Sequence, residues 1–290
     1  MEKRDILKTL VIEAGQGELN FQTHAAVTLR VRRALDDPDI AVAAVAKLIQ
    51  AEPVLAARVV AVSNSIAFAS AGRAIVDVRS AVSRLGFRNV RSLATAFLVR
   101  QMSASAKAGP LQQQMATQLW QHTSHVTALA HALARRVTHV DAEVALFAGI
   151  VHEIGGFYLL SRAKDYPGLL EGDPAGWNEE DVLALQGELD RVVLHALAVP
   201  EPVMAAMEAF WQGFLAMPPR TLGDTLLLAE DLAPVASPFH PVKPANGEKD
   251  SEVETGAAAS IEMILGADTL SAILKESADE VNSLATALQL

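Results

Sequence analysis

Apolar residues recur every three or four positions along most of this chain, which places them on one face of an α-helix. Residues 40–51 illustrate the pattern, because Ile40, Val45, Leu48 and Ile49 share a face there. Alternating apolar and polar runs bounded by Asn-Gly or Asp-Gly turns, which would indicate strands, are missing from the sequence. The pattern therefore predicts an all-α protein.

Helix start and stop signals divide the chain into segments. The predicted helices cover residues 2–15, 24–36, 40–51, 78–85, 88–102, 119–137, 145–160, 180–197, 203–215 and 222–232, and another starts at Pro53. Asp39 and Asp141 precede two of these segments and are expected to be N-caps. Gly86 is expected to stop a helix, and Gly155-Gly156 to break the apolar helix over 145–160.

The charge of the chain changes near Ala108-Gly109-Pro110. Residues 1–110 carry 15 Lys/Arg and 9 Asp/Glu, whereas residues 111–290 carry 9 and 25, within a net charge of −10. Because Gly-Pro also stops a helix, we expect an N-terminal helical subdomain over residues 1–108 and a second subdomain over 109–233.

The last part of the chain divides again. Residues 234–251 hold four prolines and few large apolar side chains, which predicts a flexible linker. Residues 252–290 return to helical spacing and predict a C-terminal helical extension that turns near Gly266-Ala-Asp268. Such a hairpin packs back on the body, or it binds a partner such as a second copy in a homodimer. The sequence leaves both arrangements open.

Composition excludes several classes of site. The chain has no cysteine, so disulfides and thiolate metal ligands are ruled out. No apolar segment at the start resembles a signal peptide, and no uninterrupted apolar run of about 20 residues predicts a membrane span. A Gly-rich phosphate loop and a Gly-x-Ser-x-Gly elbow are also missing. We therefore expect a cytoplasmic protein without a membrane partner.

Two ionisable residues stand out in the apolar run Ala145–Leu160. His152 and Glu153 are adjacent there, and burying an imidazole and a carboxylate without partners is unfavourable. A third such residue, His122, falls on the apolar stripe of the preceding helix. These side chains are therefore expected either to bind a ligand or to belong to a satisfied polar network.

Over roughly residues 24–233 the chain resembles the HDOD domain, the HD-related output domain of bacterial signalling, and the resemblance is strongest in the first half. The resemblance depends on the order and spacing of many positions, with Glu52 standing where Asp is usual. The matching positions are Asp37-Pro38, Ala46–Ile49, Pro53, Leu55, Arg58–Val60, Ser63-Asn64-Ser65, Phe68, Ile75, Ala81-Val82, Leu85-Gly86, Val90-Arg91 and Leu93. The resemblance implies an all-α, two-part fold with an HD-like second subdomain.

The related HD phosphohydrolases hold divalent metals with histidines and carboxylates, and the resemblance places part of that set in this chain. His122 corresponds to the first histidine, and His152-Glu153 corresponds to the His-Asp pair with Glu in place of Asp. The longer carboxylate displaces its oxygens by about one bond length, which disturbs tight metal geometry.

The remaining positions of the HD set are altered. The distal histidine falls near Gln186, the usual His-His pair near Phe210-Trp211, and the last aspartate near Glu230 or Asp231. We therefore expect no bound metal; if the site is active, a divalent Fe, Mn or Zn is implied, held by His122, His152 and Glu153. The degenerate metal-site positions are His122, His152, Glu153, Gln186 and Asp231.

The resemblance implies a bacterial signalling or regulatory output module that binds a protein or ligand. A groove between the subdomains, floored by His122, His152 and Glu153, is the expected site. The implied partners are signalling proteins of a two-component or cyclic-di-GMP pathway. The alternative is a divalent-metal phosphohydrolase or phosphodiesterase with a reduced ligand set.

Arginines gather in the basic half of the chain. The positions are Arg79, Arg84, Arg88 and Arg91. A nucleic-acid or nucleotide sensor that uses these arginines is a third alternative. Only one aromatic residue, Phe87, lies among them, and no DNA-reading motif is present, so the pattern does not favour it. We expect these arginines to form a docking surface for a partner or for the acidic half of the chain.

Overall fold

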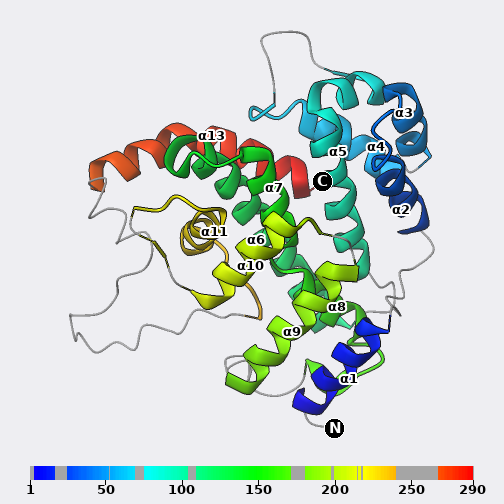
Figure 1. The fold of residues 1–290 in the computed structure, drawn as a ribbon, viewed down its shortest axis with the longest axis vertical. Helices are drawn as coiled ribbons and strands as arrows, with labels where there is room; N and C mark the ends of the chain where they lie inside the picture. Colours follow the sequence, from blue (N-terminus) through cyan, green and yellow to red (C-terminus); the bar gives the residue numbers. More distant parts are fainter. Residues whose placement is uncertain are drawn as a thin grey trace.

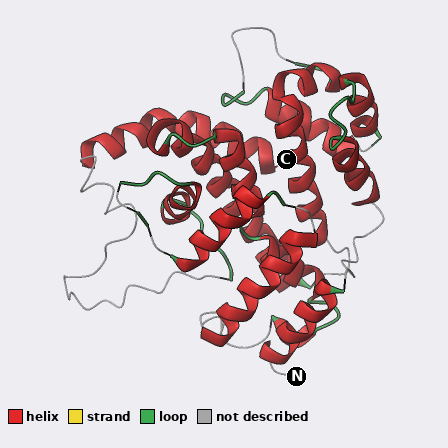
Figure 2. Ribbon diagram, viewed as in Figure 1, coloured by secondary structure: helices red, strands yellow, loops and turns green. Residues whose placement is uncertain are grey.

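A computed structural model describes residues 3–16, 25–51, 53–68, 75–103, 109–170, 180–196, 199–213, 215–216, 218–239 and 267–289. These ranges contain helices and their connections and no strand (Figure 2). The predicted all-α class is therefore confirmed.

A helix covers most of each predicted segment, although α6 begins nine residues before the predicted start at 119, and the predicted helices 78–85 and 88–102 form one helix, α5. Their bounds are α1 Lys3–Gly15, α2 Ala25–Ala34, α3 Val42–Gln50, α4 Pro53–Ser63, α5 Val78–Ser103, α6 Pro110–Leu133, α7 Ala142–Val151, α8 Ile154–Arg162, α9 Glu180–Ala196, α10 Glu201–Gln212, α11 Leu222–Asp231 and α13 Ala267–Gln289. A short π-helix, η1 Ala134–Thr138, continues α6, and a 3₁₀ turn, η2 Pro167–Leu169, follows α8.

The long helix α5 connects the two halves of the molecule (Figure 1). Helices α2, α3 and α4 pack against it on one side, and α7 and α8 pack against it on the other. Helix α1 lies against α9, and α13 lies along α6 and touches α4. Contacts therefore cross the expected boundary at residues 108/109, and the domain limits themselves stay a prediction.

Two capping predictions have different outcomes. Asp141 caps α7, since its side chain accepts hydrogen bonds from the backbone N–H groups of Glu143 and Val144. Asp39 is not the cap of α3. That helix begins at Val42, two residues after the predicted start at Ile40, and its N-cap is Ala41. The backbone N–H of Asp39 instead donates to the side chain of Asp37, and this hydrogen bond lies in the turn that precedes α3.

The apolar run over 145–160 is broken at a different place from the one predicted. Helix α7 ends at Val151 and α8 begins at Ile154, so the break falls at His152-Glu153. Gly155 and Gly156 lie inside α8, where a Cβ on the first would collide with Asp190 and on the second with the ring of Phe239. These glycines permit close approach to neighbouring segments and do not end the helix.

Gly86 produces a kink inside α5 and not the end of a helix. Its φ of +75° lies in the left-handed region that favours glycine, and helical backbone continues on both sides. The kink separates residues 78–85 from the segment that carries Arg88, Arg91 and Arg100.

The apolar stretch Ala142–Arg162 is long enough to span a membrane by length and composition. However, 83% of its most apolar window is buried inside the protein. Because it forms the two core helices α7 and α8, its apolar character is explained by the fold.

The C-terminal helix α13 packs back on the body, which is one of the two arrangements left open by the sequence. Ser283 accepts a hydrogen bond from the backbone N–H of Ile66, and Glu280 forms an ion pair with Arg135 at 2.7 Å. Residues 240–251 of the predicted linker (234–251) and the first part of the predicted hairpin, up to residue 266, lie outside the described residues.

Candidate functional site

The side chains of His122 and His152 meet where α6 approaches the end of α7. Their Nε2 atoms lie 3.1 Å apart, and neither side chain has any exposed surface. His122 comes from the middle of α6, and His152 is the residue that follows α7. The packing of these two helices therefore creates the pair that the sequence predicted from apolar periodicity and family resemblance.

Backbone carbonyls fix how both imidazoles are protonated. Nδ1 of His122 donates to the carbonyl of Val235 at 2.8 Å, and Nδ1 of His152 donates to the carbonyl of Gly149 at 2.6 Å. A carbonyl only accepts hydrogen bonds, so each Nδ1 carries a hydrogen. In the neutral form, both Nε2 atoms then present lone pairs toward each other, which is the orientation that metal-binding histidines adopt.

A carboxylate completes this group. Oε2 of Glu230, on α11, lies 3.1 Å from Nε2 of His122 and 3.5 Å from Nε2 of His152. Two facing lone pairs repel each other, so a proton or a cation is required between the histidines and the carboxylate. Burial alone would lower the pKa of His122, but the hydrogen bond and charge of Glu230 outweigh it and raise that pKa to about 9.

The donor set fits a divalent metal. The ligand atoms of His122, His152 and Glu230 all lie within 4.8 Å of one another. Two imidazole nitrogens and one carboxylate oxygen are a set that suits Zn, Fe or Mn. Among the described residues the group provides three ligands from three segments, which is fewer than the HD phosphohydrolase set implied by the resemblance.

The five predicted metal-site positions differ in their burial and in their distance from the histidine pair. Glu153 is buried, with Oε1 3.9 Å from Nε2 of His122, and it lies at the edge of the group. Gln186 is buried but is not part of the three-residue group. Asp231 is exposed, and Glu230 beside it is the carboxylate that reaches the histidines.

Asp190 is a half-buried acid that was not singled out in the sequence. Its Oδ1 accepts a hydrogen bond from the backbone N–H of Gly155 at 2.6 Å. Burial and then the charge of Glu153 raise its pKa well above the ordinary value. Asp190 and Gln186 share a face of α9, four residues apart, and with Glu153 they line a cavity of about 10 Å³. The four-residue spacing is the sequence signal that relates the two side chains.

A segment after α11 covers the histidines. The carbonyl of Val235 binds His122, the carbonyl of Ala236 accepts from Nε2 of Gln118 at 2.9 Å, and Phe239 is fully buried. His122 and His152 therefore do not floor an open groove, contrary to the expectation from sequence. The covering segment, residues 232–239, was expected to fall largely in a linker, and its packing depends on tertiary contacts.

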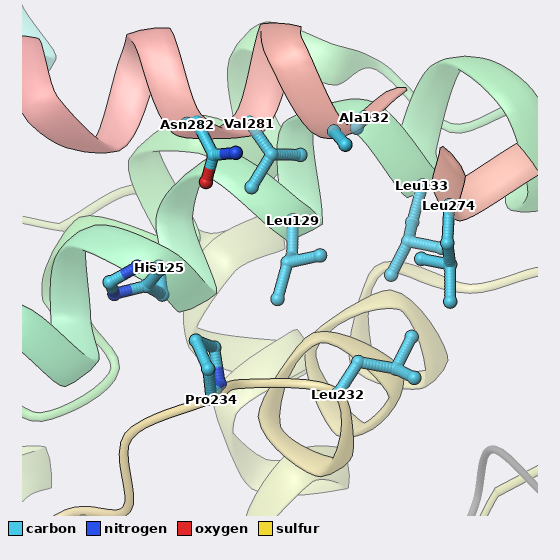
Figure 3. A pocket seen from close by; sticks show the side chains of 10 residues that line it. His125, Leu129, Ala132, Leu133, Leu232, Pro234, Leu274, Val281 and Asn282 are labelled. Atoms are coloured by element: carbon cyan, nitrogen blue, oxygen red, sulfur yellow. The ribbon is translucent and has the colours of Figure 1, made fainter. Parts of the chain in front are cut away.

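Two larger cavities lie away from the histidines. One, of about 250 Å³, opens between α6, α13 and the end of α11. His125 and Asn282 lie toward one end of it, and Leu133 and Leu274 lie toward the other (Figure 3). The second, of about 300 Å³, lies between α5, α7 and α10. Neither cavity is lined by His122 or His152.

The four arginines of the predicted docking surface differ in their exposure and in their partners. Arg79 is exposed, whereas Arg84 donates to the carbonyl of Ser63 at 3.2 Å. Arg88 pairs with Asp141 at 2.9 Å and with Glu143 at 3.3 Å, which connects α5 to α7. Arg91 pairs with Asp36 at 3.2 Å and donates to the carbonyl of Leu35. Arg88 and Arg91 also line the cavity between α5, α7 and α10.

Comparisons with known proteins agree with this architecture. The model of the HDOD domain matches residues 22–185. A crystal structure described as "Putative metal-dependent phosphohydrolase" from Shewanella amazonensis SB2B is similar, with a TM-score of 0.71, 20% identity and 99% of both chains covered. An HDOD domain protein with unknown function from Geobacter sulfurreducens has a TM-score of 0.58, 20% identity and 98% coverage of both chains. No curated protein matches the chain. At these identities the structural similarity shows the fold alone.

Proposed function

This chain belongs to the HDOD domain family, and on that premise we propose that it is a regulatory signalling module that acts by binding another molecule and not by hydrolysis. The proposed location is the cytoplasm. The proposed partners are signalling proteins of a two-component or cyclic-di-GMP pathway.

The closure of the histidine site is the observation that carries this proposal. A hydrolytic metal centre keeps a coordination position open for water and substrate. Here both imidazole side chains have no exposed surface, and Val235 covers His122 from the side opposite His152 by binding its Nδ1. Glu230, with 29% of its side chain exposed, is the member of the three-residue group that reaches solvent. Within the described residues, the side chains of His122 and His152 thus offer no surface to a phosphoester.

The cavity between α5, α7 and α10 is the proposed binding surface. Phe87 and Phe147 contribute apolar area, and Arg88 and Glu143 contribute charges of both signs. Its volume of about 300 Å³ is at the lower limit of common ligand sites. The residues of this cavity come from both halves of the chain, so a bound partner would sense the relative position of the halves.

A phosphodiesterase assay tests the non-hydrolytic reading. Wild-type protein and the His152→Ala variant would be incubated with bis(p-nitrophenyl) phosphate and Mn²⁺, Fe²⁺ or Zn²⁺. We expect equal background rates for the two proteins. Metal-dependent hydrolysis by the wild type that is lost in His152→Ala would contradict the proposal.

A metal-dependent phosphohydrolase with a reduced ligand set is the second candidate function. The convergence of both Nε2 atoms and Glu230 on one point favours it. His122, His152 and Glu230 would hold the ion, which would supply Lewis-acid activation of water and phosphate. Elemental analysis of protein purified without chelator or affinity metal tests this candidate. About one equivalent of Fe, Mn or Zn would support it, and trace metal would contradict it.

A further inference from the structure

The cavity between α6, α13 and the end of α11 has an apolar body and one polar end. Its volume is about 250 Å³, and its lining includes the leucines Leu129, Leu133, Leu232 and Leu274. Its hydrogen-bonding side chains are His125 and Asn282, which lie at the end away from Leu133 and Leu274 (Figure 3). Among the described residues that line the cavity, none is Asp, Glu, Lys or Arg. The lining therefore combines apolar surface with one hydrogen-bonding end.

The side chains at the polar end have unused hydrogen-bonding groups. Nδ1 of His125 donates to the carbonyl of Gln121 at 2.8 Å. A carbonyl only accepts hydrogen bonds, so Nδ1 carries the hydrogen, and Nε2 of the neutral ring is an acceptor. In the described part of the chain, neither this Nε2 nor the side-chain amide of Asn282 has a hydrogen-bond partner. Because His125 is half-buried and Asn282 is exposed, the polar end is where the cavity opens to solvent.

The size and lining of the cavity restrict what it can bind. Apolar protein cavities of roughly 150 Å³ bind benzene, and common ligand sites begin at about 300 Å³. A volume of about 250 Å³ therefore fits a small molecule with one short chain or ring. An ion would lose hydration without gaining a counter-charge from this lining. An apolar chain, in contrast, gains free energy by leaving water for the leucines.

We propose that this cavity binds a small neutral acyl amide. The acyl chain lies against the leucines, and the amide head lies between His125 and Asn282. The N–H of the head donates to Nε2 of His125, and its carbonyl accepts from the side-chain amide of Asn282. The site is separate from the cavity between α5, α7 and α10, so it does not depend on the binding function proposed above.

A molecule in this cavity would contact three segments of the chain. Leu129 belongs to α6, Val281 belongs to α13, and Pro234 belongs to the covering segment, residues 232–239. Pro234 precedes Val235, whose carbonyl binds His122. A bound acyl amide would therefore hold α13 against α6 and would also hold the covering segment over the histidines.

Isothermal titration calorimetry with three eight-carbon compounds tests the chemistry of the head. The compounds are octanamide, N,N-dimethyloctanamide and sodium octanoate, measured at about pH 8, where ordinary imidazoles are neutral. We expect about one equivalent of octanamide to bind saturably. N,N-dimethyloctanamide has no N–H donor and should bind about fivefold more weakly. Octanoate is charged and should bind about tenfold more weakly or less well still. No saturable binding of octanamide, or octanoate binding as tightly, would overturn the proposal.

Two variants test the location. Ala278→Trp fills the cavity from an exposed position on α13 and is expected to weaken octanamide binding by about tenfold or more. The matched control is Ala272→Trp, an exposed alanine of the same helix that does not line the cavity, and it should leave binding unchanged. His125→Phe removes the acceptor, so octanamide and N,N-dimethyloctanamide should bind this variant about equally. Equal octanamide binding by the wild type and Ala278→Trp would overturn the proposal, as would a preference for octanamide that survives in His125→Phe.

Hydrogen exchange of the wild type provides an independent readout. Octanamide is expected to slow exchange in α13 and in residues 232–239, because a molecule that joins these segments opposes their local opening. Helix α9 does not line the cavity and serves as the internal reference. Binding that leaves exchange in α13 and in residues 232–239 unchanged would place octanamide elsewhere and overturn the proposal. If another part of the chain or a second copy fills the cavity, the wild type would bind no octanamide, which is the same negative result.

Discussion

Gly149 on α7 lies against the backbone of Thr127 on α6. A Cβ added to Gly149 would stand 2.6 Å from Cα of Thr127, closer than such atoms approach in proteins. The missing side chain therefore sets the spacing of the two helices that carry His122 and His152. The carbonyl of Gly149 also accepts the Nδ1 hydrogen of His152, so the same residue sets the orientation of that ring.

Gly149→Ala is expected to destabilise the protein by about 1–3 kcal/mol, because the added methyl group forces α6 and α7 apart. Urea unfolding measures the change. The matched control is Gly187→Ala on α9, where the nearest atom to the new Cβ would be 3.7 Å away. That change is expected to stabilise by about 0.5–1 kcal/mol through helix propensity. Equal effects at the two positions would contradict the close-packing explanation.

Glu230→Gln tests which of two adjacent carboxylates, Glu230 or Asp231, is the partner of the histidines, a choice that the sequence left open. Glu230 loses its charge beside two buried imidazoles, so we expect a destabilisation of about 1–3 kcal/mol. Asp231→Asn changes an exposed neighbour and is expected to alter stability by about 0.5 kcal/mol or less. The urea midpoints of both variants, compared with that of the wild type, show which carboxylate stabilises the fold. A larger effect at Asp231 would mean that Glu230 is not the partner of the histidines.

Adjacent residues of a helix point about 100° apart, and this explains why the sequence could not choose between Glu230 and Asp231. The family spacing located the right turn of α11, but the choice depends on the rotation of the helix against α6. His122 and His152 were easier to identify, because each lies in an apolar pattern that predicts burial. Asp190 was missed because its role depends on Gly155, which belongs to another helix and contacts it only in the folded chain.

The position of the helix break at His152-Glu153 also depended on tertiary packing, which the sequence pattern does not contain. Glycine pairs commonly interrupt helices, so Gly155-Gly156 was the natural choice. In the structure these glycines admit Asp190 and Phe239 as close neighbours inside α8. Local propensity therefore predicted that the run is broken but not where, since tertiary packing determines which residues remain helical.

Stability at acid pH is expected to depend on Asp224 at the start of α11. Its carboxylate accepts hydrogen bonds from the backbone N–H groups of Ala216, Arg220 and Thr221 at 2.8–3.0 Å. Burial would raise the pKa of Asp224, but these donors outweigh it and hold the pKa below its ordinary value. A pKa that is lower in the folded state stabilises the fold above the unfolded pKa, and that contribution disappears as pH falls through the folded pKa.

Asp224→Asn is therefore expected to destabilise the protein by about 1–2 kcal/mol at neutral pH. The difference from the wild type should shrink as the pH falls from about 4, the pKa of an unfolded aspartate, toward the lower pKa of the folded carboxyl. Urea midpoints measured between neutral pH and the acid limit of folding provide the comparison. A difference that stays constant over this range would show that the charge of Asp224 does not stabilise the helix start.

The attachment of α13 is expected to depend on Glu280. Its carboxylate lies 2.7 Å from Nη1 of Arg135, 3.5 Å from Nδ1 of His131 and 3.8 Å from Nη2 of Arg136, and 10% of its side chain is exposed. The three groups belong to the end of α6 and to η1, so one carboxylate connects the C-terminal helix to the body. Removing it would leave His131 and the two arginines without their shared anion.

Glu280→Ala is expected to weaken the docking of α13 by about 1–3 kcal/mol, since it removes a largely buried carboxylate that pairs with partly exposed arginines. Hydrogen exchange measures this locally, because a helix that detaches before global unfolding loses protection in its own amides first. Exchange in α13 should accelerate while exchange in α7 and α8 stays unchanged. The matched control is Asp279→Ala, which removes an exposed carboxylate one residue away. If both variants left exchange in α13 unchanged, its attachment would depend on the apolar contacts with α6, and Val281 and Leu284 would be the residues to change next.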